Sequence, residues 1–125
     1  MTRDELAYHL RSSGTALLCS ADHRVQAIDA PMLAVCTGAC IAGPATTARA
    51  KPDDNAAVHR AVHAAGPGDV LVIDGGQDRT RAMFGDILAD ACRRKGIAGV
   101  IVRGAVRDVA SLRAISFPVW STSIH

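Results

Sequence analysis

The chain has 125 residues, of which 49% are hydrophobic and only 3% aromatic, and its formal net charge is +2. This length favours a single domain spanning residues 1–125, and the composition favours a core of Ala, Val, Ile and Leu in α/β layers. The low aromatic content argues against a single-strand nucleic-acid binder, and no apolar run is long enough to cross a bilayer.

Charge and cysteine content indicate which cellular compartment and which kinds of partner to expect. The one basic cluster, at residues 93–95, ends a predicted helix and complements its dipole, so a solvated helix end is favoured over a nucleic-acid patch. The chain opens with charged residues instead of a signal peptide, so we expect a cytoplasmic protein with no membrane partner. Without Cys-x-x-Cys spacing, free thiols are favoured over metal ligands for Cys19, Cys36, Cys40 and Cys92.

In the first half of the chain, the sequence pattern predicts helices before and after a strand. An amphipathic pattern predicts a helix over 4–11 that ends at Gly14. The Ala- and Cys-rich stretch 16–40 is consistent with a helix and a short strand. A strand is predicted over 41–50, and an apolar stripe predicts a helix over 55–65.

The second half alternates strands and helices. Met83 is assigned to the long central helix because it lies at helical spacing from Ile87, with Gly85 marking a bend where the helix proper begins. This alternation predicts a parallel sheet with crossover helices. The predicted elements are a strand over 70–73, a helix after 75–76 that runs to about Lys95, a strand over 100–102, a helix over 108–114 and a strand from 118.

Two loops that follow strands are rich in glycine and charge. They span residues 74–79 and 103–108, and we expect both to face one pocket, because ligands in open α/β sheets bind beyond the carboxyl ends of the strands. Gly85 precedes a helical turn whose free N–H groups would bind a carboxylate, and Asp86 lies in that turn.

A spaced motif connects these segments. Asp86 is followed by twenty residues and then by Arg107 and Asp108. In this setting of strands and glycines, the D-x20-R-D spacing resembles the signature of the RraA-like family, which includes 4-hydroxy-4-methyl-2-oxoglutarate aldolases. The resemblance is clearest over residues 41–120. The segments similar to the family are 43–45, 68–76, 99–102, 104–108 and 117–119.

The resemblance implies a fold and an activity. The fold would be the swivelling β/β/α type of α/β domain, with parallel strands and crossover helices. The activity would be that of a metal-dependent carbon–carbon lyase acting on 2-keto acids. Retro-aldol cleavage of 4-hydroxy-4-methyl-2-oxoglutarate and decarboxylation of oxaloacetate would both release pyruvate. The resemblance further implies a homotrimer or hexamer with sites between subunits.

The resemblance also implies residue roles. Asp108 would hold Mg²⁺ or Mn²⁺, largely through waters, and Arg107 would bind the pyruvyl carboxylate and keto oxygen. Asp86 would orient a metal-bound water that takes a proton from the substrate. A cation and a guanidinium aimed at an enolate would stabilise its charge. The start of the adjacent helix would hold the carboxylate, which maps to Gly85, Ile87 and Leu88.

The resemblance leaves alternatives open. Other RraA-like proteins are regulators that bind and inhibit a ribonuclease, and they tend to lack the Arg-Asp pair that is present here. Relatives continue beyond the strand that begins at Pro118, whereas this sequence stops at His125. A truncated fragment, a minimal member and an inactive relative all remain open. Arg103 stands where many relatives carry Asp or a small polar residue.

Other signals are discounted. His59 and His63 lie four residues apart, but the Glu of a metalloprotease motif is missing, so solvated histidines are favoured. Exposed side chains are favoured over substrate ligands for Arg79 and Arg81. Asp108 as a simple N-cap of the following helix remains an alternative to a metal ligand. Nothing resembles a site for a methyl donor.

Overall fold

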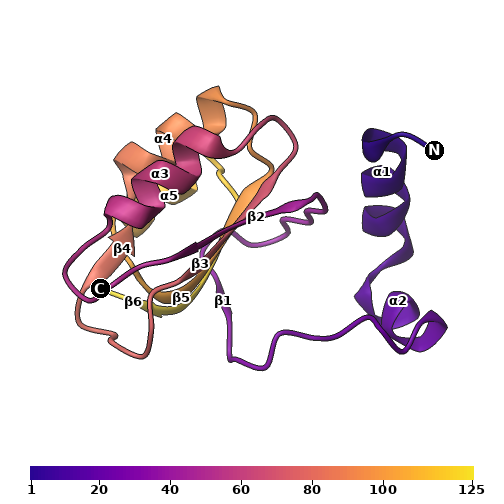
Figure 1. Ribbon diagram of the computed structural model, residues 1–125, viewed down its shortest axis with the longest axis horizontal. Helices are drawn as coiled ribbons and strands as arrows, with labels where there is room; N and C mark the ends of the chain where they lie inside the picture. Colours follow the sequence, from indigo (N-terminus) through magenta and orange to yellow (C-terminus); the bar gives the residue numbers. More distant parts are fainter.

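The computed structural model describes residues 1–125 and contains one six-stranded sheet with helices packed on one face (Figure 1). In chain order the elements are α1 Arg3–Ser13, α2 Thr15–Ala21, β1 Leu33–Ala34, β2 Ala45–Arg49, α3 Ala56–Ala64, β3 Val70–Asp74, β4 Ala82–Phe84, α4 Asp86–Arg94, β5 Gly99–Val106, α5 Val109–Ala114 and β6 Val119–Ile124.

The sheet has the order β1-β6-β5-β3-β2, and β4 pairs with β5 beyond the end of β3. Every pair is parallel except β1 with β6. Helices α3, α4 and α5 connect successive strands and lie on the same side of the sheet (Figure 1). The predicted α/β fold with parallel strands and crossover helices is therefore confirmed.

The core lies between the central strands and the helices. Leu71 and Ile73 on β3 and Val100 and Val102 on β5 are almost fully buried. Burying each of these side chains stabilises the fold by about 1.5–3 kcal/mol. The other face of the sheet is not covered by helices; there, residues in register across four strands form a row: Thr47, Val72, Ile101 and Trp120.

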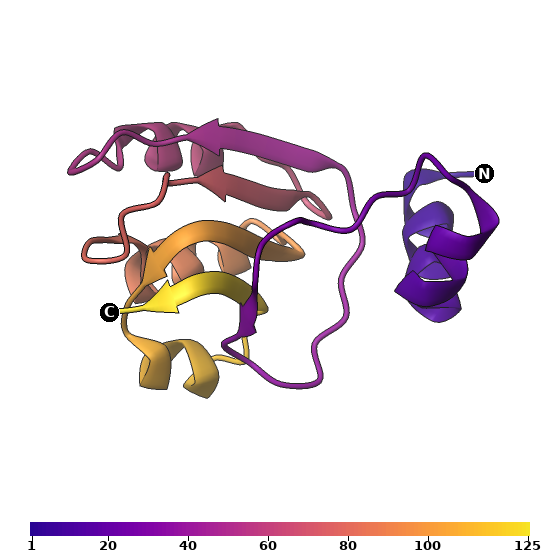
Figure 2. The same ribbon diagram turned by 90° about the horizontal axis from the view of Figure 1, so that it is seen from below.

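Helices α1 and α2 lie to one side of the sheet and are joined to it by a long segment (Figure 2). Helix α1 begins with a capping box, in which Thr2 and Glu5 each accept the other's backbone N–H. The stretch predicted as a helix and a short strand contains α2 and the two-residue β1, which confirms that expectation. No helix is long and apolar enough to cross a membrane.

Two predicted boundaries are wrong. The long helix was expected to include Met83, but residues 82–84 form β4, and α4 begins only at Asp86. Met83 and Phe84 are buried, and β4 pairs with the part of β5 beyond the end of β3. Pairing with a distant strand thus outweighs the helical spacing of Met83. The predicted strand over 41–50 is shortened to β2, and Pro44 precedes it with a carbonyl that accepts the Val70 N–H.

We expect Asp69→Asn to lower the free energy of unfolding by about 1–3 kcal/mol, because half-buried donors lose a charged acceptor. The Asp69 carboxylate accepts hydrogen bonds from the Gly66 N–H, the Thr46 hydroxyl and the Arg3 guanidinium. The pKa of Asp69 is lowered, chiefly by the Gly66 N–H; partial burial opposes this shift, and Thr46 and Arg3 reinforce it.

Urea denaturation measures this effect. Because the folded-state pKa is depressed, the stabilisation is present above pH 3.8 and is lost as the pH falls through the folded pKa. The difference between wild type and Asp69→Asn should therefore shrink in acid. Asp29→Asn, at an exposed position, is the matched control. Equal destabilisation by the two variants would contradict the assigned role of Asp69.

The four thiols are expected to differ sharply in reactivity. Cys92 is fully buried, and burial raises its pKa from 9.0 to about 12, which cuts its thiolate fraction at pH 8 about a thousandfold. Cys19 and Cys40 are exposed. Labelling with a thiol reagent, followed by peptide mass spectrometry, should modify these two rapidly and Cys92 only on unfolding. Equally fast labelling of Cys92 and Cys19 would refute the prediction.

Candidate functional site

The predicted site residues meet where β4 and β5 end. Because these strands are parallel, their carboxyl ends lie at one edge of the sheet, and the Arg107 N–H donates to the Phe84 carbonyl at 3.0 Å. Residues of the D-x20-R-D motif follow the two strands directly. The pairing of β4 with β5 thus brings together Asp86, Arg107 and Asp108, which are far apart in the sequence.

Gly85 allows this close approach. A Cβ atom at Gly85 would lie 2.6 Å from Oδ2 of Asp108 and 3.0 Å from Cγ of Arg107. The backbone of Gly85 is extended, with φ −155°, so this position needs the absence of a side chain rather than an unusual conformation. The glycine therefore lets the Arg-Asp pair pack directly against the start of α4.

The first turn of α4 presents backbone donors at the same place. The first intrahelical hydrogen bond runs from the Ala89 N–H to the Gly85 carbonyl, so the preceding amides of Ile87 and Leu88 have no intrahelical acceptor. As the N-cap, Gly85 has no side chain to accept them. The Asp86 N–H donates to Oδ2 of Asp108 at 3.3 Å. These amides and the helix dipole make the turn suited to an anion.

Asp108 is turned towards α4 by its backbone. It is the N-cap residue of α5, in the left-handed conformation with φ 59° and ψ 39°. Asp tolerates this conformation better than most residues. Its side chain makes no capping hydrogen bond to α5, so capping does not account for this residue. Oδ2 lies 3.5 Å from Nε of Arg107, whereas Oδ1 takes part in none of the hydrogen bonds or ion pairs of the structure.

A cleft of about 160 Å³ contains most of the predicted site. Arg107 lines it together with residues 85–88, which join β4 to the first turn of α4. Asn55 and His59, from the start of α3, form the opposite wall. The side chain of Arg107 is 61% exposed and that of Asp108 is 35% exposed, so the cleft is open to solvent.

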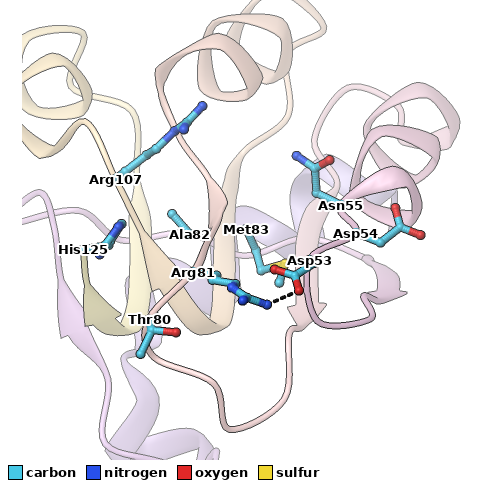
Figure 3. A pocket seen from close by; sticks show the side chains of 9 residues that line it. All are labelled: Asp53, Asp54, Asn55, Thr80, Arg81, Ala82, Met83, Arg107 and His125. Carbon is cyan, nitrogen blue, oxygen red and sulfur yellow. Dashed lines mark ion pairs between the residues drawn. The ribbon is translucent and has the colours of Figure 1, made fainter.

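A second, larger cleft of about 370 Å³ continues from the first (Figure 3). The two share Asn55, Ala82, Met83 and Arg107. Arg81, Asp53 and His125 lie farther from α4 (Figure 3). Together the clefts form an elongated, largely polar groove, which we call the α3–β4 groove.

Sequence reasoning missed one wall of this groove. His59 was expected to be a solvated histidine, and it is exposed, but it lies on the groove with Asn55. No spacing links these residues to the D-x20-R-D motif, so only the packing of α3 beside β4 reveals them. Arg81 is exposed, as expected, and it also lines the groove.

The loop 74–79 was expected to share a pocket with residues 103–108, and this expectation is wrong in part. Gly76, Gln77 and Arg79 line a different surface hollow together with Arg103. Arg103 pairs with Asp74, its neighbour across β3 and β5, at 3.3 Å. The additional cation therefore belongs to the β3–β5 pair and does not line the groove with Arg107.

The oxygen donors suit one class of metal ion. Asp108 lies beside the groove, where its Oδ2 accepts the Asp86 N–H and its Oδ1 makes no hydrogen bond or ion pair. Asp86 itself lines the groove. No group of three or more His, Cys, Asp or Glu side chains is placed to surround an ion. A hard divalent cation that keeps most of its waters fits such a donor set, whereas a structural zinc ion would need more protein ligands.

Comparisons with known proteins agree on one family. The family model described as RraA-like (Aldolase/RraA) matches residues 15–125. A protein of Halalkalibacterium halodurans, provisionally named 4-hydroxy-4-methyl-2-oxoglutarate aldolase, is 44% identical over 80 residues. The match covers 64% of this chain but only 38% of that protein, so the chain spans well under half of the relative's length.

Two solved structures share the fold at appreciable sequence identity. A protein of Geobacillus kaustophilus, described as an S-adenosylmethionine:2-dimethylmenaquinone methyltransferase, superposes with a TM-score of 0.82 at 33% identity, covering 90% of this chain and 70% of that one. The RNA-processing inhibitor RraA from Thermus thermophilis superposes with a TM-score of 0.80 at 31% identity, covering 89% and 67%.

Proposed function

The chain belongs to the RraA-like family, and we propose on that premise that it is a divalent-metal-dependent lyase that cleaves 2-keto acids and releases pyruvate. One observation carries the proposal. The pairing of β4 with β5 brings Arg107, Asp86 and the open amides of α4 to one groove, and the Asp108 carboxylate accepts the Asp86 N–H beside it. Such a set can bind a carboxylate and stabilise negative charge beside it.

Arg107 and α4 would hold the keto-acid end. The guanidinium can bind a planar carboxylate through two parallel hydrogen bonds, and the amides of Ile87 and Leu88 can donate to the same group. In retro-aldol cleavage, the bond between C3 and C4 breaks and its electrons form the enolate of pyruvate. In decarboxylation of oxaloacetate, the bond to the departing carboxylate supplies the same electrons. Both reactions therefore need the same stabilisation of an enolate.

Asp86 would take part in proton transfer, and Asp108 would bind the cation. Asp86 would accept, through a water, the proton of the hydroxyl group at C4, because Asp86 lines the groove and its carboxylate makes no hydrogen bond in the structure. Asp108 would hold Mg²⁺ or Mn²⁺ through Oδ1. The cation would supply Lewis-acid stabilisation of the enolate oxygen.

The proposal includes a homotrimer or hexamer with sites between subunits. The groove is open and Arg107 is largely exposed, whereas electrostatic stabilisation is strongest where water is excluded. Ile87, in the first turn of α4, is 75% exposed beside the groove. A neighbouring subunit that covers Ile87 would also close the groove.

The test is pyruvate release, measured with a coupled lactate dehydrogenase assay. The substrates are 4-hydroxy-4-methyl-2-oxoglutarate and oxaloacetate, each with magnesium and with excess chelator. Turnover above the metal-only background that is lost with chelator supports the proposal. A folded protein without turnover on either substrate would count against it.

A regulatory function is the second candidate, because the structure resembles that of an RNA-processing inhibitor. The proposed enzyme and a regulator differ in their need for a metal ion. Magnesium-independent inhibition of a ribonuclease by a protein inactive in pyruvate release would favour the regulator.

A further inference from the structure

We propose that Arg81 is the residue of the α3–β4 groove that binds the second carboxylate of a dicarboxylic 2-keto acid, and that Asp53 holds Arg81 ready in the free protein. This inference rests on the proposed function, because it takes the keto-acid end to lie at Arg107. It assigns the far end of the groove, to which neither the family match nor the sequence motif gives a role.

The groove has a cation towards each end. Arg107 lies beside the first turn of α4, Arg81 lies farther along, and Ala82 and Met83 lie between them (Figure 3). Arg81 directly precedes β4 and Arg107 directly follows β5, and these two strands pair with each other. A short carbon chain with a carboxylate at each end complements two cations separated by a short, partly apolar floor.

Local structure positions Arg81. Asp78 accepts hydrogen bonds from the backbone N–H and the hydroxyl of Thr80, at 2.8 and 2.6 Å, which shapes the turn just before Arg81. β4 begins directly after Arg81 and anchors it from the other side. The backbone at Arg81 is therefore held between a hydrogen-bonded turn and the sheet.

The partner of Arg81 can be displaced. The guanidinium pairs with the carboxylate of Asp53 (Figure 3), and the two side chains are 53% and 60% exposed. Exposed ion pairs contribute little to stability, so a substrate carboxylate can replace Asp53 at small cost. The pair orients Arg81 towards the groove without locking it.

Other ionisable groups lie near Arg81, but none forms an ion pair with it. The pKa of Asp78 is lowered chiefly by its hydrogen bonds from Thr80 and to a smaller extent by the charge of Arg81. The Asp54 carboxylate accepts a hydrogen bond from the N–H of Ala56, the first residue of α3, at 2.9 Å. His125 lines the groove and is exposed, and when protonated it would add a positive charge. Asp53 is thus the one carboxylate paired with Arg81 in the free protein.

Equilibrium binding tests this proposal without turnover. The ligands are 2-oxoglutarate and 2-oxopentanoate, which have the same chain length and keto end but differ in the second carboxylate. With magnesium present, isothermal titration calorimetry should give tighter binding of 2-oxoglutarate to the wild type. Arg81→Ala should weaken 2-oxoglutarate binding about tenfold and leave 2-oxopentanoate binding unchanged, because a charge-assisted hydrogen bond is lost only for the diacid.

Two further variants sharpen the test. Asp53→Asn removes the competing carboxylate and should strengthen binding of 2-oxoglutarate but not of 2-oxopentanoate. Arg79→Ala removes a neighbouring cation that lies outside the groove and should change neither. Equal binding of both ligands to wild type and Arg81→Ala would overturn the role of Arg81 while leaving the proposed function intact. Binding of neither ligand to the folded wild type would overturn both.

Discussion

Arg107→Ala should lower kcat/KM for pyruvate release by about 10²-fold to 10³-fold, the usual effect of removing one donor that stabilises developing negative charge. The guanidinium is 61% exposed and contributes little to the core, so the variant should unfold at the same temperature as the wild type. Arg107→Lys should recover only part of the loss, because an ammonium group cannot bind a carboxylate through a planar fork.

Asp108→Asn is the companion variant. Asn tolerates the left-handed backbone at this position and keeps an oxygen that can accept the Asp86 N–H, so the fold and the start of α4 should be preserved. The negative charge is lost, so turnover and magnesium affinity should both fall. Calorimetry with magnesium alone measures the affinity. Turnover and magnesium binding close to wild type in Asp108→Asn would refute the assigned role of Asp108.

Gly85→Ala should reduce kcat/KM roughly 10²-fold with little change in the unfolding temperature. The added Cβ would meet Oδ2 of Asp108 at 2.6 Å and Cγ of Arg107 at 3.0 Å, and both belong to flexible side chains that can move away. Their movement relieves the clash but displaces the site, and displacements of about 1 Å can cost two orders of magnitude in rate.

Gly66→Ala is the matched control for this substitution. Gly66 has a negative φ, and a Cβ there would meet nothing within 4 Å. Pyruvate release measured side by side should therefore be unchanged in Gly66→Ala and strongly reduced in Gly85→Ala. Normal activity in a folded Gly85→Ala would show that the close approach of Arg107 and Asp108 to α4 is not needed for catalysis.

The sequence predicted the parts of the fold that depend on local patterns. The continuous apolar run over 70–73 predicts a strand and forms β3, although helices cover only one of its faces. The apolar stripe over 55–65 forms α3. Both signals depend on the order of apolar residues within one element, so they do not require contacts with distant parts of the chain.

The limits of the sequence are clearest at Met83. Its spacing from Ile87 suits a helix, yet it lies in β4, because the distal part of β5 provides hydrogen-bonding partners once β3 has ended. The long-range pairing that decides the outcome leaves no periodic signal in three residues. The position of the strand also matters for the site, since β4 carries the chain from Arg81 to Gly85.

By itself, the sequence determined the alternation of strands and helices, the open amides at the start of α4 and the spacing of Asp86 from the Arg-Asp pair. These features are local, or are set by chain order alone. Only the tertiary structure decided that Arg103 pairs with Asp74 and that Arg81 lies on the groove. The physical reason is that strand register and helix packing set which side chains share a surface, and both depend on contacts between residues distant in the chain.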